Sequence, residues 1–285
     1  MSGTLFLCAT PIGNLSDITE RVKLTLNEVD IVACEDTRNS LKLMNAFDVH
    51  TPLTSYHEFN KFDKAYTLIE KLREGKNVAL ITDAGTPAIS DPGEVLVRMC
   101  LDEGIHVTSL PGACALITAL TLSGLPTRRF CFEGFLPFEK KERRKILKEI
   151  EDESRTTIMY EAPHRLRQTL SELRNVCGDK RNIVLCRELT KKFEEVLRFT
   201  LSEAENYYET TEPKGEYVLV LDGKSEEEKQ METARSFENM TINEHMKIYE
   251  DKGIDHKEAM KMVAKDRGIT KREVYSMLLE DKNEI

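Results

Sequence analysis

The sequence predicts an α/β protein with two α/β domains and a small helical extension at the C-terminus. Short, β-rich apolar runs alternate with longer amphipathic segments, and this alternation resumes after a break at Gly124-Leu125-Pro126. The last part, Thr241–Leu279, is helical in pattern throughout. In the first half of the chain, such alternation favours βαβ units and a mainly parallel sheet with helices on both faces. A chain of 285 residues is long enough for two domains, and we place the parts at 1–125, 126–223 and 224–285.

The first domain is predicted from four strands and the helical segments between them. The expected strands are Thr4–Ala9, Ile31–Cys34, Val78–Thr82 and His106–Leu110. The expected helices are Ile18–Leu26, Arg38–Phe47, Lys61–Glu74, Glu94–Glu103 and Ala113–Leu122. Each strand is short and each helix has an apolar stripe, as a packed layer structure requires.

The second domain repeats this pattern with more basic helices. Its expected strands are Arg129–Glu133, Thr156–Tyr160, Ile183–Arg187, Val196–Thr200 and Tyr217–Leu221, and its expected helices are Lys140–Glu151, Arg165–Asn175 and Leu201–Glu209. An acidic stretch, Ser225–Glu232, follows as a linker or the start of a solvated helix. The tail then forms two helical patterns, His256–Arg267 and Thr270–Leu279, joined across Gly268-Ile269 in a helix-turn-helix-like arrangement.

Composition favours a cytoplasmic protein with no membrane partner. The longest apolar runs, such as Cys114–Ile117, are far shorter than the roughly 18 to 20 residues that cross a bilayer. The first residues carry no basic region typical of a signal peptide. The seven cysteines are odd in number and form no C-x-x-C pair, which is typical of reduced thiols packed as small hydrophobes.

The formal net charge of −9 disfavours a nucleic-acid partner, but its distribution favours one. Residues 128–198 carry a net charge of +5 and the remainder carries −14. Within the basic stretch, six cations crowd into the nine residues 140–148, just after the apolar loop 130–137. This run is either a solvated helix face or an element that contacts phosphate beside a cleft.

Three Gly/Pro turns follow predicted strands of the first domain. They are Ala9–Leu15, Thr82–Gly93 and Leu110–Ala113. Each alone could simply reverse the chain, but ligands of open α/β sheets bind outside the carboxyl ends of the strands, where all three turns are expected. The first strand is followed by neither a Walker A loop nor a G-x-G-x-x-G motif. The pattern therefore predicts a nucleoside-like ligand held mainly by backbone groups.

The polar run Glu35-Asp36-Thr37-Arg38 ends the second predicted strand. Asp36 or Thr37 could be the N-cap of a helix, with Arg38 paired locally. The run also shares the sheet edge with the glycine turns, so a role in the site is the alternative.

Nine motifs, in order, resemble the signatures of the ribosomal RNA small subunit methyltransferase I family, in the tetrapyrrole methylase superfamily. They are Thr10–Leu15, Glu35–Arg38, Ser55–Glu58, Asp83–Pro87 with Ile89–Gly93, Pro111–Ala113, Ser123–Leu125, Glu133–Pro137, Tyr160–Arg165 and Arg187–Lys191. The resemblance covers roughly residues 4–222. Thr82 departs from an expected Ser, and Phe59 departs from a His that often follows this Tyr-His-Glu motif.

The resemblance implies an S-adenosylmethionine-dependent enzyme with its cofactor in a cleft between two α/β domains, and a homodimer. It implies methylation of the ribose 2′-hydroxyl of a cytidine in the decoding region of 16S rRNA, so the expected partner is 16S rRNA or the small ribosomal subunit. The cofactor residues carried over by matching motifs are Pro11, Ile12, Gly13, Asp83, Gly85, Thr86, Ala113, Leu136 and Ala162.

Methyl transfer of this kind requires no metal, but a side chain must help to remove the proton of the hydroxyl. The candidates for the base are Glu35, Asp36, His57, Glu161 and Lys191. His57 has the most suitable ordinary pKa, although a loop histidine is as often structural. The expected RNA contacts are Arg38, Lys140, Lys141, Arg143, Arg144 and Arg165.

Other functions remain open on the sequence. The enzyme could methylate a tetrapyrrole or a protein side chain, as other members of the superfamily do, or the chain could be a catalytically silent RNA- or nucleotide-binding module. The C-terminal helices either contribute RNA affinity or pack against the body. Phe130 and Phe132 alternate as core residues do, whereas Phe135 and Phe138 are expected in the wall of a cleft.

Overall fold

The first lobe is built on a fully parallel five-stranded sheet in the order β3-β2-β4-β1-β5. The computed structural model describes residues 2–283. The strands are β1 (Thr4–Cys8), β2 (Ile31–Cys34), β3 (Leu53–Ser55), β4 (Val78–Leu80) and β5 (His106–Leu110). The predicted parallel sheet is therefore confirmed. β3 was not foreseen, because three residues directly after Pro52 are too few to show an alternating pattern.

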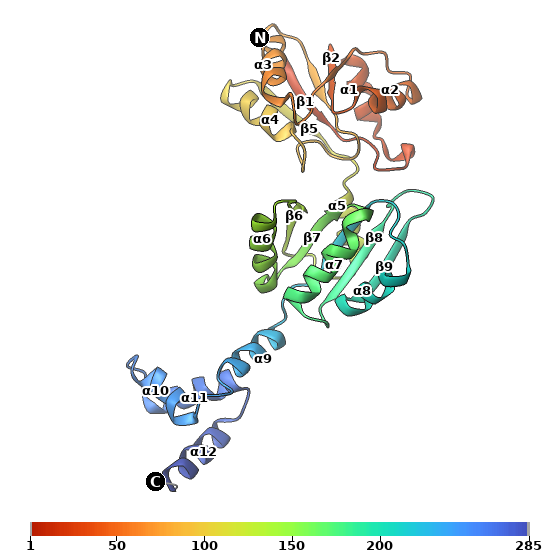
Figure 1. The fold of residues 1–285 in the computed structure, drawn as a ribbon. Helices are drawn as coiled ribbons and strands as arrows, with labels where there is room; N and C mark the ends of the chain where they lie inside the picture. Colours follow the sequence, from red (N-terminus) through yellow and green to blue (C-terminus); the bar gives the residue numbers. More distant parts are fainter. Residues whose placement is uncertain (1, 284–285) are drawn as a thin grey trace. The chain divides into compact units, whose positions relative to one another are not determined.

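Helices cover both faces of this sheet (Figure 1). The four helices are α1 (Glu20–Glu28), α2 (Thr37–Ala46), α3 (Lys61–Arg73) and α4 (Gly93–Asp102), with a short 3-10 turn, η1 (Leu15–Asp17), before α1. Leu68 of α3 and Leu96 of α4 pack with Leu5 on one face. Val22 of α1 and Met44 of α2 pack with Val32 on the other face.

The second lobe has a mixed five-stranded sheet in the order β6-β7-β10-β8-β9. Its strands are β6 (Phe130–Phe135), β7 (Thr156–Glu161), β8 (Asn182–Arg187), β9 (Glu195–Thr200) and β10 (Tyr217–Leu221). Only β6 and β7 pair in parallel, and β10 lies antiparallel to both β7 and β8. The register of β6 shifts between Phe132 and Phe135, around Gly134, whose φ is +61°.

One helix of the first half of the chain belongs to the core of the second lobe. α5 (Ala115–Ser123) follows β5, but its Leu116 and Leu120 pack on Ile158 and Val218 of the second sheet. The opposite face of that sheet is covered by α6 (Lys140–Asp152), α7 (Pro163–Cys177) and α8 (Leu201–Thr210). The two lobes therefore share α5, and our boundary after residue 125 stays a prediction.

The expected core position of Phe130 is wrong, because this side chain is exposed at the start of β6. Phe132 is partly buried and packs edge-on against Tyr160, with their ring centroids 5.0 Å apart. Strand alternation puts both rings on one face of β6, but Phe130 is the first residue of the strand and lies outside the core cluster that contains Phe132.

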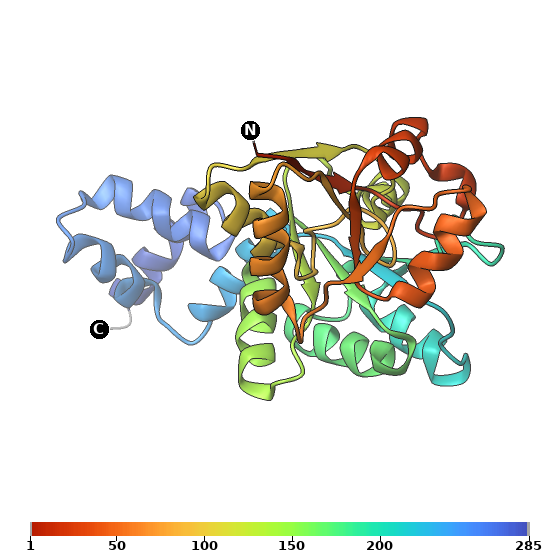
Figure 2. The same cartoon turned by 90° about the horizontal axis from the view of Figure 1, so that it is seen from above.

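The remaining helices belong to a second compact unit, which comprises Asp152–Ser154 and Gly223–Ile285. They are α9 (Glu226–Ser236), α10 (Ile242–Glu250), α11 (His256–Arg267) and α12 (Lys271–Asn283). Met246, Val263 and Val274 join α10, α11 and α12 in one small core, and these helices lie gathered together in Figure 2. The acidic stretch after residue 225 is thus a helix, and Gly268, with a φ of +66°, separates the last two helices. Among the described residues, no helix is long and apolar enough to span a membrane.

We expect Leu68→Ala to lower the free energy of unfolding by about 2–5 kcal/mol, because it leaves a cavity in a well-packed core. The side chain of Leu68 is fully buried between α3 and the first sheet. Tyr66→Ala on the same helix is the matched control, since Tyr66 is 63% exposed. Urea unfolding followed by circular dichroism measures both, and an equal effect of the two substitutions would contradict this packing.

Candidate functional site

The three predicted turns meet at the carboxyl edge of the first sheet. Thr10 and Gly85 form a two-hydrogen-bond bridge, with N···O distances of 2.9 and 3.1 Å. The hydroxyl of Thr86 donates to the carbonyl of Ala113 at 3.0 Å. Gly85 has a φ of +87°, and a Cβ there would lie 3.2 Å from a methyl carbon of Ile12. Because Gly85 has no side chain, the main chains of these turns can approach one another closely.

A cavity of about 390 Å³ opens beside these turns, a size typical of small-ligand sites. Four expected cofactor residues line it: Pro11, Ile12, Gly13 and Asp83. Of the base candidates, Lys191 lines it. The lining also includes residues that were not among the expected site residues. Thr10, Leu15, Thr82 and Ala84 come from the predicted turns, and Asn39, Ser40, Lys42, Leu43 and Glu216 were not foreseen.

Helix α2 supplies four of these unforeseen residues. Asn39, Lys42 and Leu43 recur at the three- and four-residue spacing that puts side chains on one helix face. That spacing, directly after the polar run 35–38, was the signal that could have identified them. Apolar Ile12 and Leu43 and the charged Asp83 and Lys42 together suit a ligand with an apolar body and ionic groups.

The other five expected cofactor residues do not line the cavity. Gly85, Thr86 and Ala113 lie in the turn cluster next to it. The side chain of Leu136 is buried in the core of the second lobe, and Ala162 is the N-cap residue of α7. Leu136 can thus offer a ligand only its main chain.

A loop of the second lobe, residues 188–191, packs against the first turn, Ala9–Leu15. A Cβ on Gly13 would lie 2.4 Å from Cγ of Lys191 and 2.9 Å from Oγ1 of Thr190, so only glycine fits there. The loop holds Glu188 and Thr190 at φ values of +49° and +65°, which non-glycine residues rarely adopt. Such strained backbone is typical of functional sites.

Lys191 is held by two carboxylates. Its Nζ lies 2.9 Å from Oε1 of Glu188 and 2.7 Å from Oε2 of Glu216. Burial opposes the charged form, but the hydrogen bonds and ion pairs to Glu216 and Glu188 prevail and raise the pKa of Lys191. An ammonium with a raised pKa keeps its proton at neutral pH, so Lys191 is unsuited to the role of base.

Asp36 and Glu35 are adjacent carboxylates in opposite environments. Asp36 is the N-cap of α2, and Arg38 grips both of its oxygens. The side-chain and backbone hydrogen bonds from Arg38 lower the pKa of Asp36 to about 2. Partial desolvation, followed by repulsion from Asp83 and Asp91, raises the pKa of Glu35, although part of its side chain is exposed. Of the two, Glu35 is the better proton acceptor, because its pKa is raised and that of Asp36 is lowered.

His57 presents a ring nitrogen without a hydrogen-bond partner. Its Nδ1 is buried, and none of the described residues bonds to it. The turn around it is fixed, because the backbone N–H of His57 donates to Oδ1 of Asn60 at 2.8 Å.

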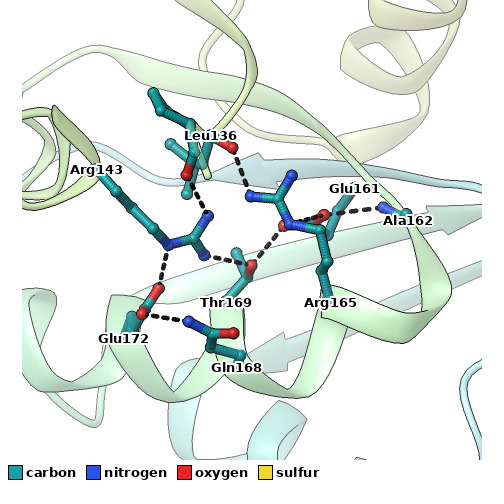
Figure 3. A network of polar contacts seen from close by, with 9 residues as sticks. Leu136, Arg143, Glu161, Ala162, Arg165, Gln168, Thr169 and Glu172 are labelled. Atoms are coloured by element: carbon teal, nitrogen blue, oxygen red, sulfur yellow. Dashed lines mark hydrogen bonds and ion pairs between the residues drawn. The ribbon is translucent and has the colours of Figure 1, made fainter. Parts of the chain in front are cut away.

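Glu161, by contrast, is enclosed in a buried polar network (Figure 3). Its side chain is fully buried, and it accepts hydrogen bonds from the N–H of Ala162 and the hydroxyl of Thr169. Nε of Arg165 lies 3.6 Å from Glu161, and the Arg165 guanidinium also donates to the carbonyl of Leu136. Glu161 neutralises a buried cation and cannot accept a proton from a bound substrate.

The same network removes two residues from the expected RNA contacts. Arg143 is 5% exposed, and it donates to Glu172 at 2.6 Å and to Thr169 at 2.8 Å. Arg165 is also buried. Both guanidinium groups are bonded to partners inside the second lobe, so our expectation that they bind phosphate is wrong. Lys140, Lys141, Arg144 and Arg38 are exposed, as that role requires.

Comparison with known proteins identifies relatives over nearly the whole chain. Residues 4–205 match the family of Tetrapyrrole (Corrin/Porphyrin) Methylases. The chain is 48% identical over 275 residues to "Ribosomal RNA small subunit methyltransferase I" of Halalkalibacterium halodurans, covering 96% of this chain and 94% of that protein. It is 47% identical to the Bacillus subtilis protein of the same name, with 96% and 93% covered.

Solved structures share the fold at low sequence identity. Diphthine synthase aligns with a TM-score of 0.63 and 16% identity, covering 79% of this chain and 91% of that one. Uroporphyrin-III C-methyltransferase from Thermus thermophilus, solved with S-adenyl homocysteine, aligns with a TM-score of 0.55 and 18% identity, covering 77% and 97%.

We expect Glu161→Gln to cost about 3–5 kcal/mol of stability, because it leaves the Arg165 charge buried with no anionic partner. Glu149→Gln is the control, with little expected loss, since Glu149 is 64% exposed and its ion pair with the exposed Lys145, at 3.8 Å, lies in solvent. Thermal and chemical unfolding measure both. Unchanged stability of Glu161→Gln together with complete loss of catalytic turnover would show that Glu161 is a base after all.

Proposed function

The chain belongs to the ribosomal RNA small subunit methyltransferase I family of the tetrapyrrole methylases, and on this basis we propose that it methylates the ribose 2′-hydroxyl of a cytidine in the decoding region of 16S rRNA. The observation that carries the proposal is a similarity over 96% of the chain, together with a family match over residues 4–205, which span the turns of the site. The chain is a methyltransferase, and its cofactor is S-adenosylmethionine.

The residues of the site fit this cofactor. Gly13 and Gly85 let the loops around the cavity pack closely, because Lys191 fills the space beside Gly13 and Ile12 fills the space beside Gly85. Asp83 and Lys42 offer charges of both signs to the amino and carboxylate groups of the amino-acid end. We assign Pro11, Ile12, Gly13 and Asp83 to cofactor binding in the cavity, Gly85, Thr86 and Ala113 in the adjoining turns, and the main chain at Leu136 and Ala162.

Catalysis then rests on positioning and on one proton transfer. When bound, S-adenosylmethionine supplies an electrophilic methyl group. The turns must hold the 2′-oxygen in line with that group, which lowers the barrier by removing orientational freedom. Glu35 and His57 are the two candidates left to accept the hydroxyl proton, since Asp36 binds its proton too weakly and Glu161 is enclosed.

RNA is the proposed partner, either as 16S rRNA or within the small ribosomal subunit. The exposed cations Arg38, Lys140, Lys141 and Arg144 provide the phosphate contacts of this proposal. A role of the C-terminal helices in RNA affinity stays a prediction, and deletion of residues 225–285 tests it by the affinity for small-subunit particles. A homodimer and a cytoplasmic location also remain part of the proposal.

We expect transfer of labelled methyl from S-adenosylmethionine to 16S rRNA, with the label on the 2′-oxygen of one cytidine. The assay offers the protein free rRNA and assembled small subunits, followed by mapping of the labelled nucleotide. Label on a base carbon, on a protein side chain or on an added tetrapyrrole would assign the chain to one of the alternative activities. Binding of RNA without any transfer would make it a silent binding module.

We expect Glu35→Gln to lower kcat by about 10²- to 10⁴-fold with unchanged cofactor affinity, because the variant cannot accept a proton. The pKa of Glu35 is raised. In the parent, kcat should therefore fall on acidification at a higher pH than for an ordinary glutamate, and recover as the pH rises through that pKa.

Asp36→Asn is the matched control on the neighbouring carboxylate, and its kcat should stay close to that of the parent. His57→Ala tests the second candidate by the same pH profile. Full turnover in both Glu35→Gln and His57→Ala would remove the base from the mechanism and leave positioning alone.

A further inference from the structure

An exposed phenyl ring stands between the core of the second lobe and its basic helix. Phe138 lies in the loop between β6 and α6 and is 82% exposed. The guanidinium carbon of Arg165 lies 4.1 Å from the centroid of this ring. One face of Phe138 therefore rests on a cation, while most of the ring surface is open to solvent.

The cation beneath the ring is firmly held. Arg165 is buried, donates to the carbonyl of Leu136 and lies beside the fully buried carboxylate of Glu161. A ring that packs on such a group keeps a defined position without any ligand. Ligand contact with it then costs little conformational entropy, as is the case for preorganised binding residues.

Helix α6 places a row of cations directly after this ring. Lys141, Arg144, Lys145 and Lys148 are exposed and follow the spacing of one helix face, while Leu147 is on the buried face. Both oxygens of Glu139 accept backbone N–H groups of the first turn, from Lys141 at 3.0 Å and Glu142 at 2.7 Å. Because this carboxylate already caps the helix, an anion at this surface must be held by the cationic side chains.

We propose that Phe138 is a stacking platform for an unpaired base of the RNA substrate, whose adjoining phosphates are held by the exposed cations of α6. The inference rests on the proposed function and adds a positioning residue to it. An aromatic ring next to a row of cations is the combination that single-stranded nucleic acid requires, since bases stack on the ring and phosphates pair with the cations. The row of cations complements the regularly spaced negative charges of a phosphate backbone, which makes RNA the occupant that the charges favour.

We expect Phe138→Ala to weaken binding of small-subunit particles and of a single-stranded RNA oligonucleotide by about 5- to 100-fold. Phe138→Trp should bind within a few-fold of the parent, because stacking is kept. Phe62→Ala is the matched control. Phe62 is also exposed and also lies beneath a cation, Lys61, but it belongs to α3 of the first lobe. The Phe62→Ala variant should therefore bind RNA as the parent does. A 2-aminopurine base in the oligonucleotide should be quenched by the parent and by Phe138→Trp, and not by Phe138→Ala.

Controls separate stacking from folding and assembly. Cofactor affinity, melting temperature and sedimentation coefficient should be the same for the parent and for Phe138→Ala. Lys141→Glu with Arg144→Glu should weaken binding and reduce its salt dependence, while the quenching by bound RNA remains.

Two results would overturn the inference: unchanged RNA affinity of Phe138→Ala, or a change in its oligomeric state, which would make the ring part of a contact between copies. Failure of the proposed function gives a different result. In that case the parent protein transfers no methyl group to rRNA, whereas the stacking signal and its loss in Phe138→Ala are still measured.

Discussion

The buried carboxylate of Glu161 is the constraint on which much of the second lobe depends. A fully buried charge is tolerated only if a cation and hydrogen-bond donors surround it. Arg165 and Thr169 meet this requirement from the first turns of α7, so they fix that helix against the end of β7. Thr169 also accepts from Arg143, which ties α6 to the same network. One ionised group thus orients two helices and the loop between β6 and α6.

Neighbouring residues in the first lobe show how environment assigns roles to chemically identical groups. Glu35 and Asp36 are adjacent in the sequence, yet the pKa of Glu35 is raised by partial desolvation and repulsion, while that of Asp36 is lowered by Arg38. The difference arises because Asp36 caps α2 and pairs with Arg38, whereas Glu35 is repelled by Asp83 and Asp91. Separation of pKa values in this way is how paired acids acquire distinct functions.

The parallel sheet and the convergence of its turns were predictable, because strand ends of a parallel sheet must meet at one edge and the glycines mark those ends. The partners of the charges were not predictable. Helical spacing puts Arg143 on the face of α6 that carries Leu147 and Ile150, but its partners, Glu172 and Thr169, come from α7. Likewise, the contribution of Glu216 to the cavity depends on how β10 pairs with β8, which no local pattern reveals. The assignment of α5 to the second sheet is also a tertiary effect, since its apolar stripe suits either lobe.

Two glycines lie where the lobes touch, and one of them, Gly13, also lines the cavity. Gly13 lies against Lys191, and Gly134 leaves space for the hydroxyl of Ser90, which would be 2.6 Å from a Cβ at that position. Glycine has no side chain that could be shortened further, so at these two points the separation of the sheets is already at its lower limit. Every substitution of Gly13 or Gly134 can only widen the opening. Natural variation in the size of this site must therefore come from the residues around the contacts and not from the contacts themselves.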